Sequence, residues 1–310
     1  MKIKVFLTAI TILILLTLIS CNKSNKPAGT KTIGVSLLTR GHIFYRDLED
    51  GLKAQAEKDG YQVIIASADF DLNKQISQVE DFISRKVDAI VVCPVDSKGV
   101  GPAIEEANKA DIPVFTADIA AEQGNVVSHI ASDNVAGGKL AGEFLAKALN
   151  GKGNIAIINQ PAITSVLDRV QGFKEAISKY PGIKVVADVN GQGVRDRSLQ
   201  AAADVLQSHP DLNGIFGIND DSALGALDAV KQFNRKGISI VGYDATPPAR
   251  KEILAGTALK ADVIQNPNLI GKTTVDEIKL HFEGKATPKV VPVEVGIVDK
   301  EALEKDSPAK

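Results

Sequence analysis

Apolar runs alternate with amphipathic segments along most of the chain. The clearest unit spans residues 214–247, where the apolar runs 215–218 and 238–241 flank a segment with helical spacing of apolar side chains. The polar cluster 219–222, Asn-Asp-Asp-Ser, follows the first run and can cap the helix. The pattern predicts a strand, a helix and a second strand, and such a unit buries its strands in a parallel sheet.

The same alternation fills both halves of the chain. The first half predicts strands at 32–38, 61–66, 89–93 and 114–116 and helices at 44–58, 72–85 and 100–109. After a short apolar run at 126–130, the second half predicts helices at 135–149, 164–179, 197–207, 248–255 and 268–282, strands at 154–158, 183–189 and 258–264, and an edge run at 290–295. Repeated alternation of this kind predicts an α/β fold with doubly wound parallel sheets. Two similar halves without a long linker indicate two lobes that face each other across a cleft.

Polar residues follow several of the predicted strands. They are Arg40 and His42 after the first strand, together with the aromatic residues Phe44 and Tyr45, Asp118 after the fourth, and Asn219, Asp244 and Gln265 after later strands. Each one alone is more often a cap or turn residue than a ligand contact. The carboxyl ends of parallel strands share one edge, however, and open α/β sheets bind their ligands there. Carboxylates and amides bind vicinal hydroxyls and aromatic rings cover C–H faces, so the set favours a neutral polyol.

The first 31 residues predict export. Lys2 and Lys4 precede an apolar run at 5–19, which is too short to cross a bilayer comfortably and is typical of a signal peptide over residues 1–20. The sequence Leu-Ile-Ser-Cys resembles a bacterial lipobox, in which Cys21 becomes the lipidated first residue of the mature chain. Residues 21–31 would then form a flexible tether, and the protein would lie in the periplasm or at the cell surface, anchored to a membrane. The alternative is an ordinary signal peptide in which Cys21 is incidental.

Composition and motifs exclude several classes of function. A formal charge of −2 offers nucleic acid no cationic surface. The four histidines, His42, His129, His209 and His281, have no ligand-like spacing, so neither a metal site nor a cofactor is expected. No hydrolase or phosphate-loop motif occurs, and we expect no catalytic residues. The stretch 191–196 begins like a dinucleotide fingerprint but has Asp196 where the third glycine belongs. Cys93 lies in an apolar run, which predicts a buried thiol rather than a disulfide.

A dispersed set of motifs carries a family resemblance. The motifs are the segment 127–134 with Gly137-Gly138-Lys139, the segment 169–173, Asn219-Asp220 with 224–227, the segment 241–247 and Ile264-Gln265. In order and spacing they resemble the periplasmic ribose-binding protein family, the type I solute-binding proteins of ABC sugar importers. The resemblance runs from about Thr32 to Leu303.

The resemblance implies two Rossmann-like lobes with parallel sheets, joined by a three-strand hinge near Ser132, Gln265 and Val293. Residues 32–132 plus 266–293 would form the N-terminal lobe, and 133–265 plus 294–310 the C-terminal lobe. The implied ligand-binding residues are Phe44 and Tyr45, which would sandwich the sugar ring, His42 in place of a family amide, Asp118, Arg169, Asn219, Asp244 and Gln265, with Arg40 in the first loop. A monomer of this kind captures a monosaccharide and delivers it to an ABC permease.

Departures from the family pattern bear on the sugar. The first loop is longer than in ribose binders, Ile119 stands where they carry a second arginine, and the usual aromatic is missing around 193–195, so that one wall is open or differently filled. Fructose, or another pentose, hexose or polyol, therefore fits better than ribose. Three alternatives remain: a repressor of the lactose-repressor family, for which residues 1–31 supply no DNA-binding helices; a receptor that feeds a sugar or furanosyl signal to a sensory membrane protein; and a sugar-processing enzyme.

Overall fold

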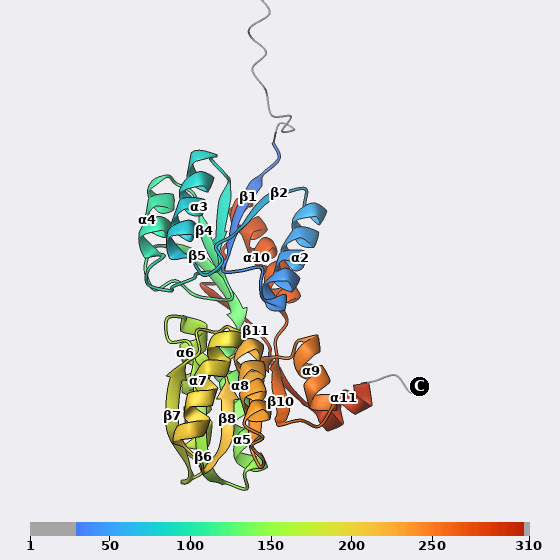
Figure 1. Ribbon diagram of the computed structural model, residues 1–310. Helices are drawn as coiled ribbons and strands as arrows, with labels where there is room; N and C mark the ends of the chain where they lie inside the picture. Colours follow the sequence, from blue (N-terminus) through green and yellow to red (C-terminus); the bar gives the residue numbers. More distant parts are fainter. Residues whose placement is uncertain (1–28, 307–310) are drawn as a thin grey trace, which may run out of the picture. The chain divides into compact units, whose positions relative to one another are not determined.

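The computed structural model describes residues 29–306 (Figure 1). The predicted signal peptide and lipobox, with Cys21, lie outside the described residues. None of the helices within residues 29–306 combines the length and the apolar character that a bilayer crossing requires. Cys93 is a buried free thiol, as its apolar run predicted.

The first lobe is built on a six-stranded sheet in the order β11-β5-β4-β3-β1-β2, with every pair parallel. Its strands are β1 (Thr32–Leu37), β2 (Gln62–Ser67), β3 (Ala89–Val92), β4 (Val114–Ala117), β5 (Val126–Ser132) and β11 (Val290–Val293). Helices α3 (Leu72–Ser84) and α4 (Gly101–Lys109) lie on one side, and α2 (Ile43–Lys58) and α10 (Pro267–Phe282) on the other (Figure 1). Every residue of β1, β3 and β4 is buried, because helices cover both faces of the sheet, and this explains their unbroken apolar runs.

The second lobe repeats the plan with the order β12-β10-β9-β8-β6-β7. Its strands are β6 (Lys152–Asn159), β7 (Gly182–Asn190), β8 (Leu212–Gly217), β9 (Ser239–Asp244), β10 (Leu259–Ile264) and β12 (Gly296–Asp299). Its helices are α5 (Asn134–Ala148), α6 (Thr164–Ile177), α7 (Arg195–Ser208), α8 (Asp220–Gln232), α9 (Pro247–Leu254) and α11 (Lys300–Asp306). The strands are parallel except β12, which pairs antiparallel with β10. β12 and α11 were not predicted from the sequence; β12 is only partly buried and lacks the continuous apolar run that marks β3 and β4, and α11 has only seven residues.

The chain passes between the two sheets three times. It leaves the first sheet after β5, returns after β10, and leaves again between β11 and β12. The edge run predicted at 290–295 corresponds to the edge strand β11, which ends at Val293, and a separate strand of the other sheet, β12, begins at Gly296. The two-lobed α/β fold with three crossings is confirmed.

Two glycines allow α5 and α6 to pack closely. A Cβ on Gly138 would lie 2.0 Å from the backbone oxygen of Arg169, and one on Gly172 would lie 2.0 Å from that of Val135. In the first lobe, Gly51 and Gly271 play the same part between α2 and α10. The backbone of Arg169 is therefore held directly against α5, and its side chain starts from a rigid support.

Replacing Gly172 should destabilise the protein strongly. In Gly172→Val the added carbons meet a backbone oxygen that cannot move without separating the two helices, so we expect the free energy of unfolding to fall by about 3 kcal/mol. Urea denaturation measures this change. Gly296→Ala is the control, because the nearest atom to its new Cβ would be 3.9 Å away. Equal stability of both variants would contradict the close-packing argument.

Candidate functional site

A pocket lies between the lobes at the carboxyl ends of their strands. It is lined by Leu38, His42, Phe44, Tyr45, Phe70, Asp118 and Ile119 from the first lobe, by Gln160, Ile163, Ser165, Val166, Arg169, Ile218, Asn219 and Asp244 from the second, and by Gln265 at a crossing. All of the ligand-binding residues predicted from the sequence belong to this lining except Arg40. The carboxyl ends of the strands thus bring together residues that are far apart in the chain.

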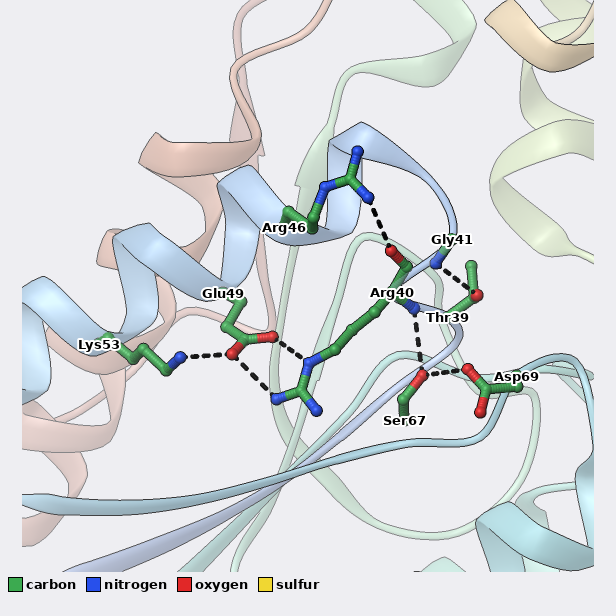
Figure 2. Close-up of polar contacts among 8 residues, drawn as sticks. All are labelled: Thr39, Arg40, Gly41, Arg46, Glu49, Lys53, Ser67 and Asp69. Atoms are coloured by element: carbon green, nitrogen blue, oxygen red, sulfur yellow. Dashed lines mark hydrogen bonds and ion pairs between the residues drawn. The ribbon is translucent and has the colours of Figure 1, made fainter.

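The side chain of Arg40 is directed along α2 instead (Figure 2). Its Nε and Nη2 donate to the two carboxylate oxygens of Glu49 at 2.6 and 2.9 Å, and Lys53 binds the same carboxylate. The hydrogen bond from Arg40 lowers the pKa of the Glu49 carboxyl. The backbone oxygen of Arg40 accepts from Arg46, so the whole residue braces the start of α2. The structure does not bring Arg40 together with the other predicted residues.

Tyr45 and Asp118 form the first-lobe side of the pocket. The hydroxyl of Tyr45 donates to Asp118 Oδ2 at 2.7 Å. Asp118 Oδ1 is buried and has no hydrogen-bond partner among the described residues. Burial raises the pKa of the Asp118 carboxyl, and the positive charge of Arg169 opposes this rise. The rings of Phe44 and Tyr45 meet edge to face with centroids 5.2 Å apart, so both present carbon surface at the pocket.

The lobes touch directly on two sides of the pocket. His42 Nε2 lies 3.0 Å from Asp221 Oδ2 of the second lobe without hydrogen-bond geometry. Burial lowers the pKa of His42, and the carboxylate of Asp221 opposes that effect. On another side, the backbone nitrogen of Thr164 donates to the Ser97 hydroxyl at 3.1 Å. The two lobes therefore contact each other directly, in addition to lining the pocket together.

Arg169 is held by three elements of the second lobe. Its Nε donates to Asn134 Oδ1 at 2.8 Å, and its Nη1 donates to the backbone oxygen of Ile218 at 2.9 Å. Its guanidinium carbon lies 3.9 Å from the centre of the Tyr243 ring, within the range of a cation–π contact. Only 5% of Arg169 is exposed. The buried guanidinium therefore places a fixed positive charge between the carboxyl groups of the two lobes.

Three residues of the second lobe and the crossing complete the polar lining. Asn219 Oδ1 caps α8 by accepting from the Ser222 nitrogen at 2.8 Å, while its Nδ2 donates to the Gly193 oxygen at 3.0 Å. Asp244 Oδ1 accepts from Gln265 Nε2 at 2.6 Å. Gln265 Oε1 is buried without a partner in the part of the chain that is described. Burial and the nearby Asp220 raise the pKa of Asp244 to about 8, against the effect of Arg169.

Of the three histidines outside the pocket, His129 is partly buried and contacts a neighbouring strand. His129 Nδ1 lies 2.9 Å from the Thr116 hydroxyl, and burial lowers the pKa of this histidine to about 4. Across residues 29–306, no group of three or more His, Cys, Asp and Glu side chains is arranged to hold a metal ion.

Comparison with known proteins decides the family. A family model described as a periplasmic binding protein domain matches residues 33–286. The ribose import binding protein of Haemophilus influenzae is 35% identical over 295 residues, which cover 95% of this chain and 99% of that protein. The chain belongs to the periplasmic ribose-binding protein family.

Solved members of this fold agree with that assignment. An ABC transporter solute binding protein from Mycobacterium smegmatis, solved with bound glycerol, matches with a TM-score of 0.85 and 32% identity over 91% of this chain and 98% of that chain. The fructose binding periplasmic domain of a hybrid two component system matches with a TM-score of 0.84 and 28% identity over 89% of this chain and 92% of that chain. The family resemblance inferred from dispersed motifs is confirmed.

The binding-protein pocket also contains residues that the sequence analysis missed. Phe70 and Gln160 line it, and they follow β2 and β6 in the chain. The strand-end argument applied to every strand would have found both. A Cβ on Gly193 would lie 2.2 Å from Gln160 Oε1, so Gln160 fills the wall near 193–195 where an aromatic was expected to be missing. Ser165 and Val166 come from the first turn of α6, and no sequence signal marked them.

Proposed function

We propose that this protein captures a monosaccharide in the interlobe pocket and delivers it to the permease of an ABC importer. The observation that carries the proposal is a set of buried polar atoms that have no hydrogen-bond partner among the described residues and belong to the pocket lining. They are Asp118 Oδ1 and Gln265 Oε1. An unsatisfied buried polar group costs about 1–3 kcal/mol. Hydroxyl groups of a sugar donate and accept hydrogen bonds, so a single sugar can satisfy both.

The proposal gives each pocket residue a role. Phe44 and Tyr45 cover the C–H face of the ring, and Asp118 and Asp244 accept hydrogen bonds from hydroxyls. Arg169, Asn219, Gln265 and His42 complete the polar contacts. Arg40 is left out of the contact set, because Glu49 engages its guanidinium.

Closure of the lobes would couple binding to transport. We place the hinge at the crossings near Ser132, Gln265 and Val293, with residues 32–132 plus 266–293 as one lobe and 133–265 plus 294–310 as the other. A sugar that touches both lobes stabilises their closed arrangement through contacts that the open one lacks. A micromolar dissociation constant corresponds to about 8 kcal/mol, which several hydrogen bonds and ring packing can supply.

Export and anchoring complete the proposal. Residues 1–20 act as a signal peptide, Cys21 carries the lipid, and residues 21–31 are the tether of a monomer in the periplasm or at the cell surface. Membership of a periplasmic binding protein family supports export. The proposal assigns no catalytic residue and no cofactor. Its preferred sugar is fructose or another pentose, hexose or polyol, while the Haemophilus influenzae relative supports ribose as a candidate as well.

The second candidate function is a receptor that feeds a sensory membrane protein. It is favoured by the likeness to the fructose binding domain of a hybrid two component system. Deleting the gene separates the two: loss of uptake of the radiolabelled sugar supports import, and unchanged uptake with a lost transcriptional response supports sensing.

A thermal-shift screen against pentoses, hexoses and polyols tests the proposal. A ligand at 100 times its dissociation constant stabilises the folded state by about 2.7 kcal/mol, which raises the melting temperature of a protein of this size by about 5–10 °C. We expect such a shift with one sugar or a small group of related sugars. No shift with any of them would count against a sugar as the ligand.

A further inference from the structure

The turn that carries Asp244 into the pocket has an unusual backbone. Asp244 has φ 117° and Ala245 has φ 54°, so two consecutive residues other than glycine lie in the left-handed region. Such conformations persist only where surrounding contacts hold them. Because Asp244 is proposed to bind the sugar, whatever holds this turn also sets the direction of its carboxyl group.

Two buried carboxyl groups hold the turn. Asp262 Oδ1 on β10 accepts from the Ala245 nitrogen at 3.1 Å. Asp220 Oδ2, at the first residue of α8, accepts from the Thr246 nitrogen at 2.7 Å and from the Thr246 hydroxyl. Asp262 is fully buried and Asp220 is 5% exposed. Each backbone N–H that follows Asp244 is thus bound by a different carboxyl group, and these groups come from two different elements.

The other oxygen of each carboxyl group is buried and lacks a partner among the described residues. These atoms are Asp220 Oδ1 and Asp262 Oδ2. Gly242 on β9 makes room for the second, since a Cβ there would lie 2.5 Å from Asp262 Oδ2 and 3.0 Å from the Ala223 side chain of α8. The Asp262 carboxyl therefore lies beneath the first turn of α8, where Asp220 begins the helix.

The charges around this pair do not balance two carboxylates. Asp221 adds negative charge beside Asp220, and Asp244 is a further buried carboxyl group beside Asp262. Two arginines of this region bind other groups: Arg169 donates to Asn134 and to the Ile218 oxygen, and Arg250 Nε donates to the Ala245 oxygen at 2.6 Å. Burial and the charge of Asp220 raise the pKa of Asp262 well above its usual value, and burial raises that of Asp220 to about 6. Neighbouring buried carboxyl groups avoid repulsion when they share one proton.

We propose that Asp262 stays protonated and that its O–H group donates a hydrogen bond to the Asp220 carboxylate. This pair, which shares one proton, fixes the position of Asp244. With the proton between them, Asp262 Oδ2 and Asp220 Oδ1 satisfy each other, and the two remaining oxygens hold the N–H groups of Ala245 and Thr246. The role for Asp244 rests on the proposed sugar-binding function. The shared proton itself does not.

Asp262→Asn is the matched replacement. An asparagine supplies an oxygen for the Ala245 nitrogen and an N–H donor for Asp220, but it holds no titrating proton. The unfolded wild-type chain releases the Asp262 proton near its ordinary pKa, whereas the folded chain keeps it. The contribution of Asp262 to stability is therefore fully present below the unfolded pKa and is lost as pH rises towards the raised folded pKa. Asp262→Asn should abolish this part of the loss, and Asp262→Ala should leave the Ala245 nitrogen unpaired.

Three measurements on the mature protein test the pair without any sugar. At neutral pH the difference between the infrared spectra of the wild type and Asp262→Asn should contain the band of one buried protonated carboxyl, because subtraction removes the contribution of Asp244, whose pKa is raised to about 8. The melting temperature should fall less between about pH 5 and pH 8 in Asp262→Asn than in the wild type. Hydrogen exchange of the Ala245 and Thr246 amides should stay slow in Asp262→Asn and become at least about tenfold faster in Asp262→Ala. Absence of the band, or unchanged exchange in Asp262→Ala, would overturn the proposal.

Sugar affinity tests the positioning role, with D-ribose and D-fructose as probes in calorimetry. Asp262→Ala should weaken binding at least about tenfold, and Asp262→Asn should change it by less than about threefold. Equal weakening by both would overturn the shared proton in favour of an ionised Asp262. If neither sugar binds the wild type, that result counts against the proposed ligand class, and the infrared, melting and exchange measurements still decide on the pair.

Discussion

Asp244→Ala is expected to abolish sugar binding while the protein stays folded. The carboxyl group lies at the end of β9 in the pocket lining and is oriented by Gln265 at 2.6 Å. A hydrogen bond contributes about 0.5–1.5 kcal/mol and a polar group left unpaired in a buried site costs about 1–3 kcal/mol, so losing the carboxyl weakens binding by about 100-fold or more. The substitution also removes a buried acid whose pKa is raised to about 8, so we expect the melting temperature without sugar to change little. Isothermal calorimetry with the sugar found in the thermal-shift screen measures the affinity.

Arg40→Ala is the matched control for Asp244→Ala. Both residues were predicted from the sequence to bind the ligand, but the Arg40 guanidinium lies on Glu49 rather than in the pocket. We expect its affinity to equal that of the wild type. Wild-type affinity in Asp244→Ala would show that the site is wrongly assigned, and lost affinity in Arg40→Ala would show that Arg40 belongs to the residues that contact the sugar.

The second large effect is expected for Arg169→Met. The side chain donates to Asn134 and to the Ile218 oxygen, and it is the positive charge beside Asp118 and Asp244. Removing one member of a buried, hydrogen-bonded charge cluster costs about 3–5 kcal/mol. We expect urea denaturation to show a loss of that order and calorimetry to show no sugar binding. The pKa values of Asp118 and Asp244 should rise further once the opposing charge is gone.

An exposed arginine provides the comparison for Arg169→Met. Arg195 binds Asp228 at 2.7 Å with its side chain 44% exposed, and pairs of this kind contribute about 0–1 kcal/mol. Arg195→Met should therefore unfold at nearly the wild-type urea concentration. If Arg169→Met were as stable as Arg195→Met, the buried guanidinium would not hold the second lobe as described.

The fold was predictable because it depends on burial patterns that the sequence displays directly. Parallel strands covered on both faces produce continuous apolar runs, and β1, β3 and β4 were found from such runs. The strands at the end of the chain were harder to predict. The apolar residues on either side of Glu294 belong to different sheets, and nothing in their spacing reports the change of partner.

The site was predictable only as far as it follows from topology. Asp118, Asn219 and Asp244 were found because strand ends converge, whichever side chains they carry. The direction of a side chain depends on partners elsewhere in the chain, as the binding of Arg40 to Glu49 demonstrates. Asp262 was missed for the same reason, since it lies within the apolar strand β10 and contacts the turn after β9.

A crystal structure of the protein with its best-stabilising sugar tests the central claim most directly. We predict the sugar between the lobes, with hydroxyl groups within hydrogen-bond distance of both Asp118 and Asp244 and its ring against Phe44 or Tyr45. A sugar bound outside this pocket, or inside it without contact to either carboxyl group, would contradict the account.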